Sequence, residues 1–220
     1  MTKISTLFTL LLVTISSFGQ LKEGHISFKI DVTADKPEMQ MQVGMMQGSS
    51  LDIYFKEKVT RSEFTMGTMM KMITITNPEK DAMLLLMSGM LGTKAIKSSI
   101  TDAKKETDKT PEVNVKLEEE TKEILGFKCK KAIVTDGEGN ESIYWYTTEL
   151  NVDKNGQNML NDKIPGVALE YEINQQGMKM LMTATSIEKK LDKKAKDLFE
   201  MTIPEGYTEV SAEDLQKMGQ

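Results

Sequence analysis

The sequence predicts a mainly β (α+β) protein whose strands form an antiparallel sheet, accompanied by a few short helices. Two observations support this fold class. Apolar and polar residues alternate with a period of two through much of the chain, as in a strand with one buried face. Turn-forming clusters such as Asn77-Pro78-Glu79-Lys80 and Gln175-Gln176-Gly177 separate the alternating segments. Because about ten such segments follow one another through short connections, neighbouring strands should pair as hairpins.

The alternation places the first strand at residues 26–32, and similar patterns predict strands at residues 51–55, 113–117 and 167–173. Residues 82–87 differ because they are apolar on both faces of the expected strand. A strand of this kind needs cover on each side. A curved sheet with a helix across its concave face provides that cover.

Helical patterns are few. Asp35 and Glu38 have the spacing of a capping box, so we expect a short helix over residues 39–46. The same methionine-rich stretch also alternates with period two, which leaves a strand as the alternative. Residues 98–111 are polar and charged and predict a surface loop.

The C-terminal part of the chain contains two further helix signals. Apolar residues recur at helical spacing and predict an amphipathic helix over residues 189–199. A peripheral contact with anionic lipid head groups is one interpretation of its basic face, and a solvated face is the other. Ser211 and Asp214 have the spacing of a capping box at the start of a last short helix. The basic residues are Lys189, Lys190, Lys193, Lys194 and Lys196.

Residues 1–19 have the features of a secretory signal peptide. Lys3 supplies a positive charge, residues 7–15 are apolar apart from two threonines, and Ser17 and Gly19 are small residues at the positions that signal peptidase reads. The apolar run is shorter than the roughly 20 residues that span a membrane. We therefore expect cleavage near Gly19, a periplasmic or secreted product, no transmembrane segment, and a single domain over residues 20–220.

Composition excludes several functional classes. One His and one Cys among 220 residues exclude an intramolecular disulfide framework and metal sites built from several His or Cys ligands. The net charge of −5 argues against a nucleic-acid partner. His25 lies on the polar face of the first strand, so we expect a solvated side chain rather than a catalytic base. The chain is predicted to be non-enzymatic, with no cofactor, no metal and no catalytic residue.

Cys129 has two interpretations. Lys128 and Lys130 flank it, and neighbouring cations can lower the pKa of a thiol and make it reactive. Phe127 and Ile133 share its strand face, however, which favours a small buried side chain. We expect the buried, structural role.

Methionine is the most unusual feature of the composition. The chain has 18 Met, compared with 7 Phe, 5 Tyr and 1 Trp, and they cluster at residues 39–46, 66–72, 83–90 and 178–182. Thioethers suit Cu(I), although copper proteins generally add the His or Cys ligands that are scarce in this chain. Methionine also forms pliable apolar pockets and fills cores. A copper site, a ligand pocket and a methionine-rich core are therefore the alternatives.

The interpretation that we carry forward is a hydrophobic-ligand pocket. Its ligand would be a lipid or the acyl chain of an acylated protein. Binding of Cu(I) through methionine clusters, and a structural or interaction role without a ligand, remain as alternatives. The candidate lining residues are apolar residues on strand faces: Phe28, Met66, Met83, Met87, Trp145, Met180 and Met182.

Two segments carry a family resemblance. The first is Glu123-Ile124-Leu125-Gly126-Phe127-Lys128-Cys129-Lys130-Lys131-Ala132, followed by Tyr144-Trp145-Tyr146-Thr147. The second is Ile164-Pro165-Gly166-Val167-Ala168-Leu169-Glu170. Their order and spacing resemble the GLPGLI family and related domain-of-unknown-function families of bacterial envelopes. The match to the name-giving hexapeptide is partial, because Lys163 stands in place of its first Gly and Ala168 in place of its last Ile.

Those families are similar in fold to the periplasmic lipoprotein carriers. The resemblance implies a strongly curved antiparallel sheet, a half-open barrel, closed by helices over a hydrophobic cavity. In the carriers that cavity takes acyl chains. The resemblance supplies no catalytic residue, and its Gly126-x-x-Cys129 pattern implies that the cysteine is structural.

Overall fold

The computed structural model describes residues 21–90, 92–107, 113–150, 152, 163–175, 177–192, 197–212 and 214. The expected signal peptide over residues 1–19 therefore lies outside the described residues. The first six strands are β1 (Glu23–Ala34), β2 (Ser50–Lys56), β3 (Val59–Met66), β4 (Met70–Asn77), β5 (Ala82–Gly89) and β6 (Gly92–Ser98). The other six are β7 (Asn114–Ile124), β8 (Phe127–Thr135), β9 (Glu141–Thr147), β10 (Val167–Gln175), β11 (Met178–Glu188) and β12 (Thr208–Glu209).

All twelve strands belong to one sheet, in the order β12-β6-β5-β4-β3-β2-β1-β11-β10-β9-β8-β7. Consecutive strands pair as antiparallel hairpins within β1–β6 and within β7–β9 and β10–β11, as the turn signals predicted. β1 joins the two halves by pairing with β11, and β12 is the one described strand that pairs in parallel, with β6. The mainly β, antiparallel fold class is confirmed.

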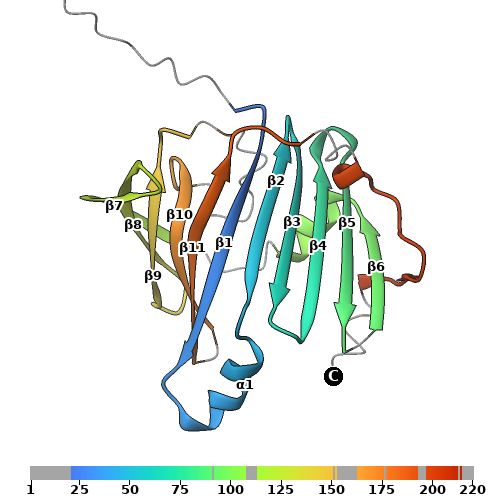
Figure 1. Ribbon diagram of the computed structural model, residues 1–220, viewed down its shortest axis with the longest axis horizontal. Helices are drawn as coiled ribbons and strands as arrows, with labels where there is room; N and C mark the ends of the chain where they lie inside the picture. Colours follow the sequence, from blue (N-terminus) through green and yellow to red (C-terminus); the bar gives the residue numbers. More distant parts are fainter. Residues whose placement is uncertain are drawn as a thin grey trace, which may run out of the picture.

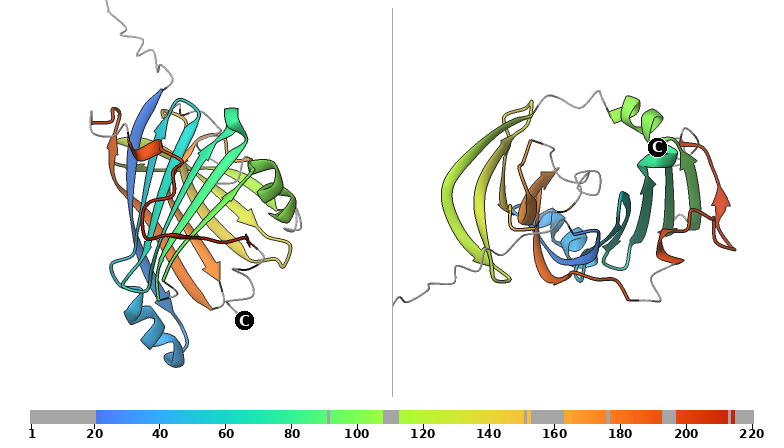
Figure 2. Two further views of the ribbon diagram at one scale, coloured as in Figure 1. Left: turned by 90° about the vertical axis from the view of Figure 1, so that its right-hand side faces the viewer. Right: turned by 90° about the horizontal axis from the view of Figure 1, so that it is seen from above.

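The sheet curls into an open trough. Seen from above, β7–β9 form one wall and β4–β6 the other, with β1 at the base (Figure 2). The C-terminal segment, residues 197–210, crosses the convex side in front of β4–β6 (Figure 1). The curved sheet with an open side agrees with the half-open barrel that the resemblance implied.

The turn between β7 and β8 shows how local sequence fixes a hairpin. Ile124 pairs with Phe127, which leaves Leu125 and Gly126 as a two-residue loop. Both loop residues have positive φ, 51° for Leu125 and 80° for Gly126. This backbone is the one that a type I′ turn needs, and glycine adopts it without steric cost. The glycine of the resemblance motif is therefore a turn residue.

Strand β5 is covered on its convex side by an extended segment, whereas the expectation was a helix across the concave face. Leu84 and Leu86 are buried there with Ile75 and Ala95, under side chains of the C-terminal segment. This segment stays extended because β12 pairs with β6 and the Val210 amide donates to the Ala95 carbonyl. The covering side chains are Met201, Ile203 and Tyr207.

One helix expected from the sequence is present, and one segment expected to be a loop is helical. The helix expected over residues 39–46 is present as a 3₁₀ turn at Pro37–Met39 and α1 (Gln40–Met45), but Asp35 does not cap it. The loop expected over residues 98–111 is wrong where it is described, because Ile100–Thr107 form α2. Ser99 and Asp102 make a capping box, in which the Asp102 amide donates to Ser99 Oγ over 2.9 Å. That capping box was the signal for the helix.

The amphipathic helix expected over residues 189–199 is not found in the described part of that range. Residues 189–192 are not helical and residues 197–199 form a 3₁₀ turn, whereas residues 193–196 lie outside the described set. The chain passes here from the end of β11 to the convex side of β4–β6 (Figure 1). The described residues 189–192 leave the end of β11 without helical turns, and extended chain advances about 3.3 Å per residue, compared with 1.5 Å in a helix. The expected cap at Ser211 is confirmed, since Ser211 Oγ accepts from the Asp214 amide.

The apolar interior is unevenly filled. The larger buried cluster lies around β1, β8–β11 and α1, and a smaller one lies beneath the C-terminal segment. The concave side chains of β3–β5, in contrast, are only half-buried. One part of the trough is thus packed as a core, and the part above β3–β5 keeps exposed apolar surface.

Candidate functional site

A single row of side chains crosses the concave face of the sheet. The strand register pairs Phe28 with Leu51, Leu51 with Phe64, Phe64 with Met72, Met72 with Met87, and Met87 with Lys94. Directly paired residues lie on the same face of a sheet. Phe28 and Leu51 are buried, whereas Phe64, Met72 and Met87 are half-buried. The row therefore passes from the core into partly exposed apolar surface and ends at Lys94.

The neighbouring row contains two methionines and two glycines. Here Met66 pairs with Met70, Met70 with Gly89, and Gly89 with Gly92. A Cβ at Gly92 would meet no atom within 4 Å, whereas a Cβ at Gly89 would overlap the Met69 carbonyl. A cavity of about 170 Å³ lies at this place. Ser88, Gly89, Gly92 and Lys94 form part of its lining. The rest of the lining consists of five methionines: Met66, Met69, Met70, Met87 and Met90.

The cavity is apolar and small. Its volume is comparable to that of the roughly 150 Å³ apolar cavities that take up a benzene ring. It can therefore hold a ring or a short length of alkyl chain, and a longer apolar ligand would extend along the half-buried row. We call Met66, Met69, Met70, Met87, Met90 and Lys94 the methionine pocket.

The structure brings together two of the seven candidate lining residues, Met66 and Met87, in the methionine pocket. Met83 lies on the same face, at the other end of β5, where it pairs with Thr76 and Ser98. Phe28 and Met182 are buried in the larger core, and Met180 is packed against it.

Trp145 lies apart from the other candidates. Tyr144 stacks on Tyr171, which packs edge-on against Phe28 on the concave side. Trp145 follows Tyr144 in β9, and successive strand residues point to opposite faces. Its ring accordingly lies on the convex side, where Lys122 Nζ is 4.5 Å from the ring centroid.

The candidate lining did not include Met69, Met70, Met90 or Lys94, although the three methionines lie in the clusters at residues 66–72 and 83–90. Met70 was within reach, because it alternates with Met72 in the strand pattern of residues 66–72. Lys94 had no local signal, since its place beside Met87 depends on the pairing of β5 with β6.

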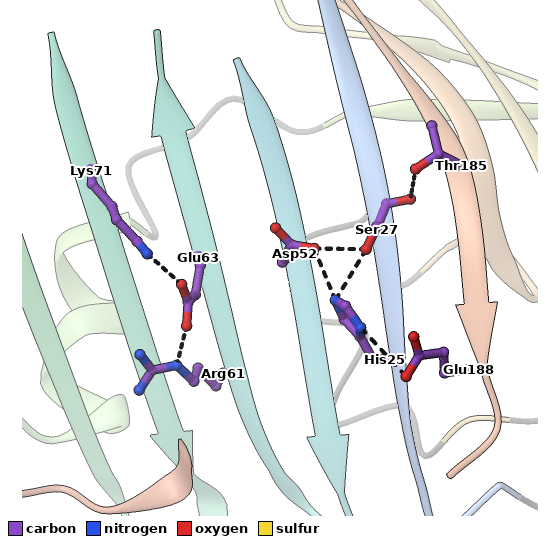
Figure 3. A network of polar contacts seen from close by, with 8 residues as sticks. All are labelled: His25, Ser27, Asp52, Arg61, Glu63, Lys71, Thr185 and Glu188. Atoms are coloured by element: carbon purple, nitrogen blue, oxygen red, sulfur yellow. Dashed lines mark hydrogen bonds and ion pairs between the residues drawn. The ribbon is translucent and has the colours of Figure 1, made fainter. Parts of the chain in front are cut away.

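A polar network occupies the convex face of β1–β4 (Figure 3). His25 Nε2 lies 2.8 Å from Asp52 Oδ1 and 3.1 Å from Ser27 Oγ, and the His25 ring stacks on Tyr54 with 4.1 Å between centroids. The His25 side chain is 14% exposed, so the expected solvated residue is instead half-buried and hydrogen-bonded. Desolvation by burial, with the nearby Asp52 carboxylate, raises the pKa of Tyr54.

This network does not have the geometry of a catalytic triad. A triad places the nucleophile and the carboxylate on different ring nitrogens of the histidine. Here Ser27 and Asp52 both lie at Nε2, and Ser27 Oγ donates its proton to Asp52 Oδ1 over 2.7 Å. The Ser27 oxygen is therefore held by a carboxylate and is not activated by the histidine.

A second polar group holds the convex face together. Arg61 Nε donates to Glu63 Oε1 over 2.7 Å, and Lys71 Nζ lies 2.6 Å from Glu63 Oε2 (Figure 3). Burial raises the pKa of Glu63, but the hydrogen bonds from Lys71 and Arg61 outweigh it and leave the pKa below its usual value. Glu63 is thus held as a charged carboxylate between two cations.

Cys129 is fully buried, as the strand pattern predicted. Desolvation raises the pKa of its thiol to about 11, although the nearby Lys122 opposes the shift. The neighbouring lysines of the sequence do not activate it. Gly166 of the second motif also has a packing role, because a Cβ there would overlap the Thr147 carbonyl of β9. The motif residues Gly126, Cys129 and Gly166 therefore serve the fold.

The described residues contain neither a membrane-spanning helix nor a cluster of metal-ligating side chains. None of the helices in the described part of the chain has the length and apolarity to cross a lipid bilayer. Within that same part, His, Cys, Asp and Glu side chains do not gather in threes as metal ligands do.

Comparison with protein families gives one match. The family described as the N-glycanase peptide, N-terminal domain, matches residues 70–209, which is more than half of the chain. The chain belongs to this family. The matched range begins at β4 and ends with β12, so it includes most of the methionine pocket and the C-terminal segment. The family shown differs from the GLPGLI family that the sequence motifs resemble.

Comparison with solved structures adds two similar chains. One, described as the structure of PNGF-II, is 17% identical, with 89% of this chain and 32% of that chain covered and a TM-score of 0.49. This N-glycanase-family chain thus spans about a third of the PNGF-II chain. The other is a LolA superfamily protein, NE2245 from Nitrosomonas europaea, at 8% identity, with 80% and 90% covered and a TM-score of 0.21. A search of curated proteins gives no match.

Proposed function

We propose that this chain is a non-enzymatic binder of a hydrophobic ligand, which it holds in the methionine pocket and along the half-buried row of the concave face. The observation that carries the proposal is the cavity of about 170 Å³ that five methionine side chains line on the concave face. Methionine is unbranched and polarizable, so such a lining adapts to ligands of different shapes. Removal of apolar surface from water at about 25 cal/mol per Å² would drive the binding.

The first experiment asks whether the purified protein carries or binds an apolar molecule. Solvent extraction followed by mass spectrometry detects a co-purified lipid or acyl chain. Titration with N-phenyl-1-naphthylamine, a neutral apolar dye, should give saturable fluorescence enhancement. The absence of both would contradict the proposal and would favour a structural or interaction role without a ligand.

A matched pair of variants locates the binding. Met70→Glu places a carboxylate in the apolar pocket and should weaken dye binding at least about tenfold, because the carboxylate loses hydration there and Lys94, the one cation of the lining, compensates only in part. Met41→Glu makes the same change at a side chain that is 79% exposed in α1 and should leave binding unchanged. Equal dye affinity in both variants would place the ligand elsewhere.

A second candidate function rests on the same five side chains. Thioether sulfurs are soft ligands that suit Cu(I), and here several of them line one cavity. Anaerobic titration with Cu(I) against bicinchoninate tests this alternative. Retention of one Cu(I) per chain, lost when Met69 and Met70 are replaced by Gln, would support it over the apolar ligand.

The non-enzymatic part of the proposal has its own support and test. The family name refers to an N-glycanase, and this chain matches its N-terminal domain. The Ser27 hydroxyl donates to Asp52, and the Cys129 thiol is buried with a raised pKa, so neither has the character of an activated nucleophile. Incubation of the protein with the glycoprotein ribonuclease B should release no glycan. Glycan release that increases with the concentration of this protein would contradict the non-enzymatic proposal.

We also propose that the protein is exported as a single domain, residues 20–220, to the periplasm or the medium. The support is the composition of residues 1–19, with Lys3 before an apolar run and small residues at Ser17 and Gly19. Intact-mass measurement of the exported product should show a chain that begins near Gln20. A product that retains Met1 would contradict cleavage.

A further inference from the structure

We propose that the ligand of the methionine pocket is a single-chain amphiphile with a carboxylate headgroup, whose headgroup is bound by Lys94. This inference rests on the proposed function and specifies the chemical class of the ligand. It follows from the one charged side chain that the pocket lining contains.

Lys94 is placed for this role by the register of the sheet. It pairs with Met87 across the β5–β6 hairpin, so its side chain shares the concave face with the apolar row. It is also half-buried, and it lines the same cavity as five methionines. The Lys94 side chain therefore borders an apolar surface rather than an open polar one.

No side-chain hydrogen bond or ion pair joins Lys94 to any of the residues that the structure describes. Other lysines of the sheet behave differently, for example Lys71, which pairs with Glu63, and Lys122, which pairs with Glu170. A lysine that lines an apolar cavity through its aliphatic stem and has no carboxylate partner keeps its ammonium group available for an anionic ligand group. An anionic ligand group would supply the missing partner.

The headgroup chemistry follows from the number and geometry of the donors. Lysine presents one compact positive charge, which balances one negative charge and leaves a doubly charged phosphate monoester only half neutralised. A carboxylate with a single charge fits one lysine. From Lys94 the row continues through Met87 and Met72 to Phe64, three strand spacings or about 14 Å away. An alkyl chain can follow this row, with part of it in the cavity beside Met66 and Met70.

The test compares three ligands that share a twelve-carbon chain: dodecanoate, dodecan-1-ol and dodecylamine. Each displaces N-phenyl-1-naphthylamine from the purified protein at concentrations below micelle formation. We expect dodecanoate to bind roughly three- to tenfold more tightly than the alcohol, and the amine to bind most weakly. The preference for dodecanoate should decrease as salt concentration rises.

Variants assign the preference to Lys94. Lys94→Met keeps an apolar stem and should bring dodecanoate and the alcohol to equal affinity, through the loss of the charge contact with dodecanoate. Lys94→Arg should retain the preference, and Lys94→Glu should reverse it in favour of the amine. Lys97→Met is the matched control, because Lys97 is exposed on the opposite face of the same strand and its loss should change nothing.

The outcomes separate this inference from the proposed function. If dodecanoate and the alcohol bind equally well to the unmodified protein, or if Lys94→Met keeps the preference, the inference is overturned and the apolar pocket stands. If none of the three ligands displaces the dye and the dye itself does not bind, the proposed function fails as well. Near-UV circular dichroism of each variant shows that it is folded, and Lys94→Gln replaces Lys94→Met if that variant is not.

Discussion

Arg61 Nη1 donates a hydrogen bond of 3.0 Å to the main-chain carbonyl of Leu198, which lies 137 residues later in the chain. The same guanidinium donates to Glu63 within β3. One side chain thus joins the convex face of the sheet to the beginning of the C-terminal segment. This segment then covers Ile75 and Leu84, so the contact at Leu198 helps to fix a cover over part of the core.

Replacement of Arg61 by Ala should loosen the C-terminal segment. The variant loses hydrogen bonds to Leu198 and Glu63 and leaves Glu63 with Lys71 alone, which should lower the free energy of unfolding by about 1–3 kcal/mol. Hydrogen exchange should show faster exchange of amides in residues 197–210. Lys116→Ala removes an exposed ion pair and serves as the control, with little change expected. Unchanged exchange in Arg61→Ala would show that the segment is held by its apolar contacts alone.

The stability contribution of Glu63 should depend on pH. Its pKa is lower in the folded protein than in the unfolded chain, because the hydrogen bonds from Lys71 and Arg61 outweigh burial. Its contribution is therefore fully present above the unfolded pKa, about 4.3, and is lost as pH falls through the folded pKa. Urea unfolding of the wild type and Glu63→Gln should differ at pH 7 and converge in acid. Glu119→Gln, at a carboxylate that is 93% exposed, should track the wild type at every pH.

Cys129 should be unreactive in the folded protein. Its thiol is buried and its pKa is raised to about 11, so little thiolate is present at pH 8. Iodoacetamide should label it only after denaturation, as measured by mass spectrometry. Cys129→Ala should be better tolerated than Cys129→Ser, because serine brings a hydroxyl group into an apolar site. Rapid labelling under native conditions would mean that this part of the core opens readily.

Leu84 tests the cover that the C-terminal segment provides. It is fully buried between β5 and this segment, so Leu84→Ala should lower the free energy of unfolding by about 2–5 kcal/mol. Leu117→Ala makes the same truncation at a side chain that is 50% exposed and should cost no more than about 0.5 kcal/mol. Chemical denaturation of the two variants measures the difference. Similar costs would indicate that the convex cluster is not a packed core.

Alanine substitutions at two glycines should change the stability of the fold in opposite directions. Gly67 has a φ of 49°, and a Cβ there would overlap the Met45 carbonyl, so Gly67→Ala should destabilise the β3–β4 turn by about 1–3 kcal/mol. Gly44 lies inside α1, where a Cβ meets no atom within 4 Å, so Gly44→Ala should stabilise by about 0.5–1 kcal/mol. Thermal unfolding of the two variants measures the expected loss and the expected gain of stability. The Gly67 variant should also bind the apolar dye less well, because Met66 and Met69 flank the turn.

The period-two pattern predicted the strands and their faces because both are local properties of the sequence. It placed Ile26 to the interior, His25 to the other face and Cys129 in a buried position. The partners of these residues required the strand register. Nothing in residues 24–28 indicates that His25 meets Asp52, which is 27 residues away on the next strand.

The methionine pocket was predictable only in part for the same reason. The abundance of methionine and the apolar strand faces indicated Met66 and Met87, but only the pairing of β3–β6 brings them together with Met70 and Lys94. Trp145 was chosen for its apolar character, and its phase relative to Tyr144 puts it on the other face. α2 had a local signal in Ser99 and Asp102, which the charged composition of the segment outweighed.

The central place of β1 has a consequence for the order in which the sheet folds. Within β1–β6, and within β7–β11, each strand pairs with its neighbour in the sequence, whereas β1 and β11 are separated by most of the chain. Contacts between distant segments form slowly, because closing a long loop costs chain entropy. The seam between Phe28 and Ala184 should therefore form late, after two smaller sheets have assembled. The methionine pocket lies wholly within the first of these sheets, so it can exist before the trough is complete.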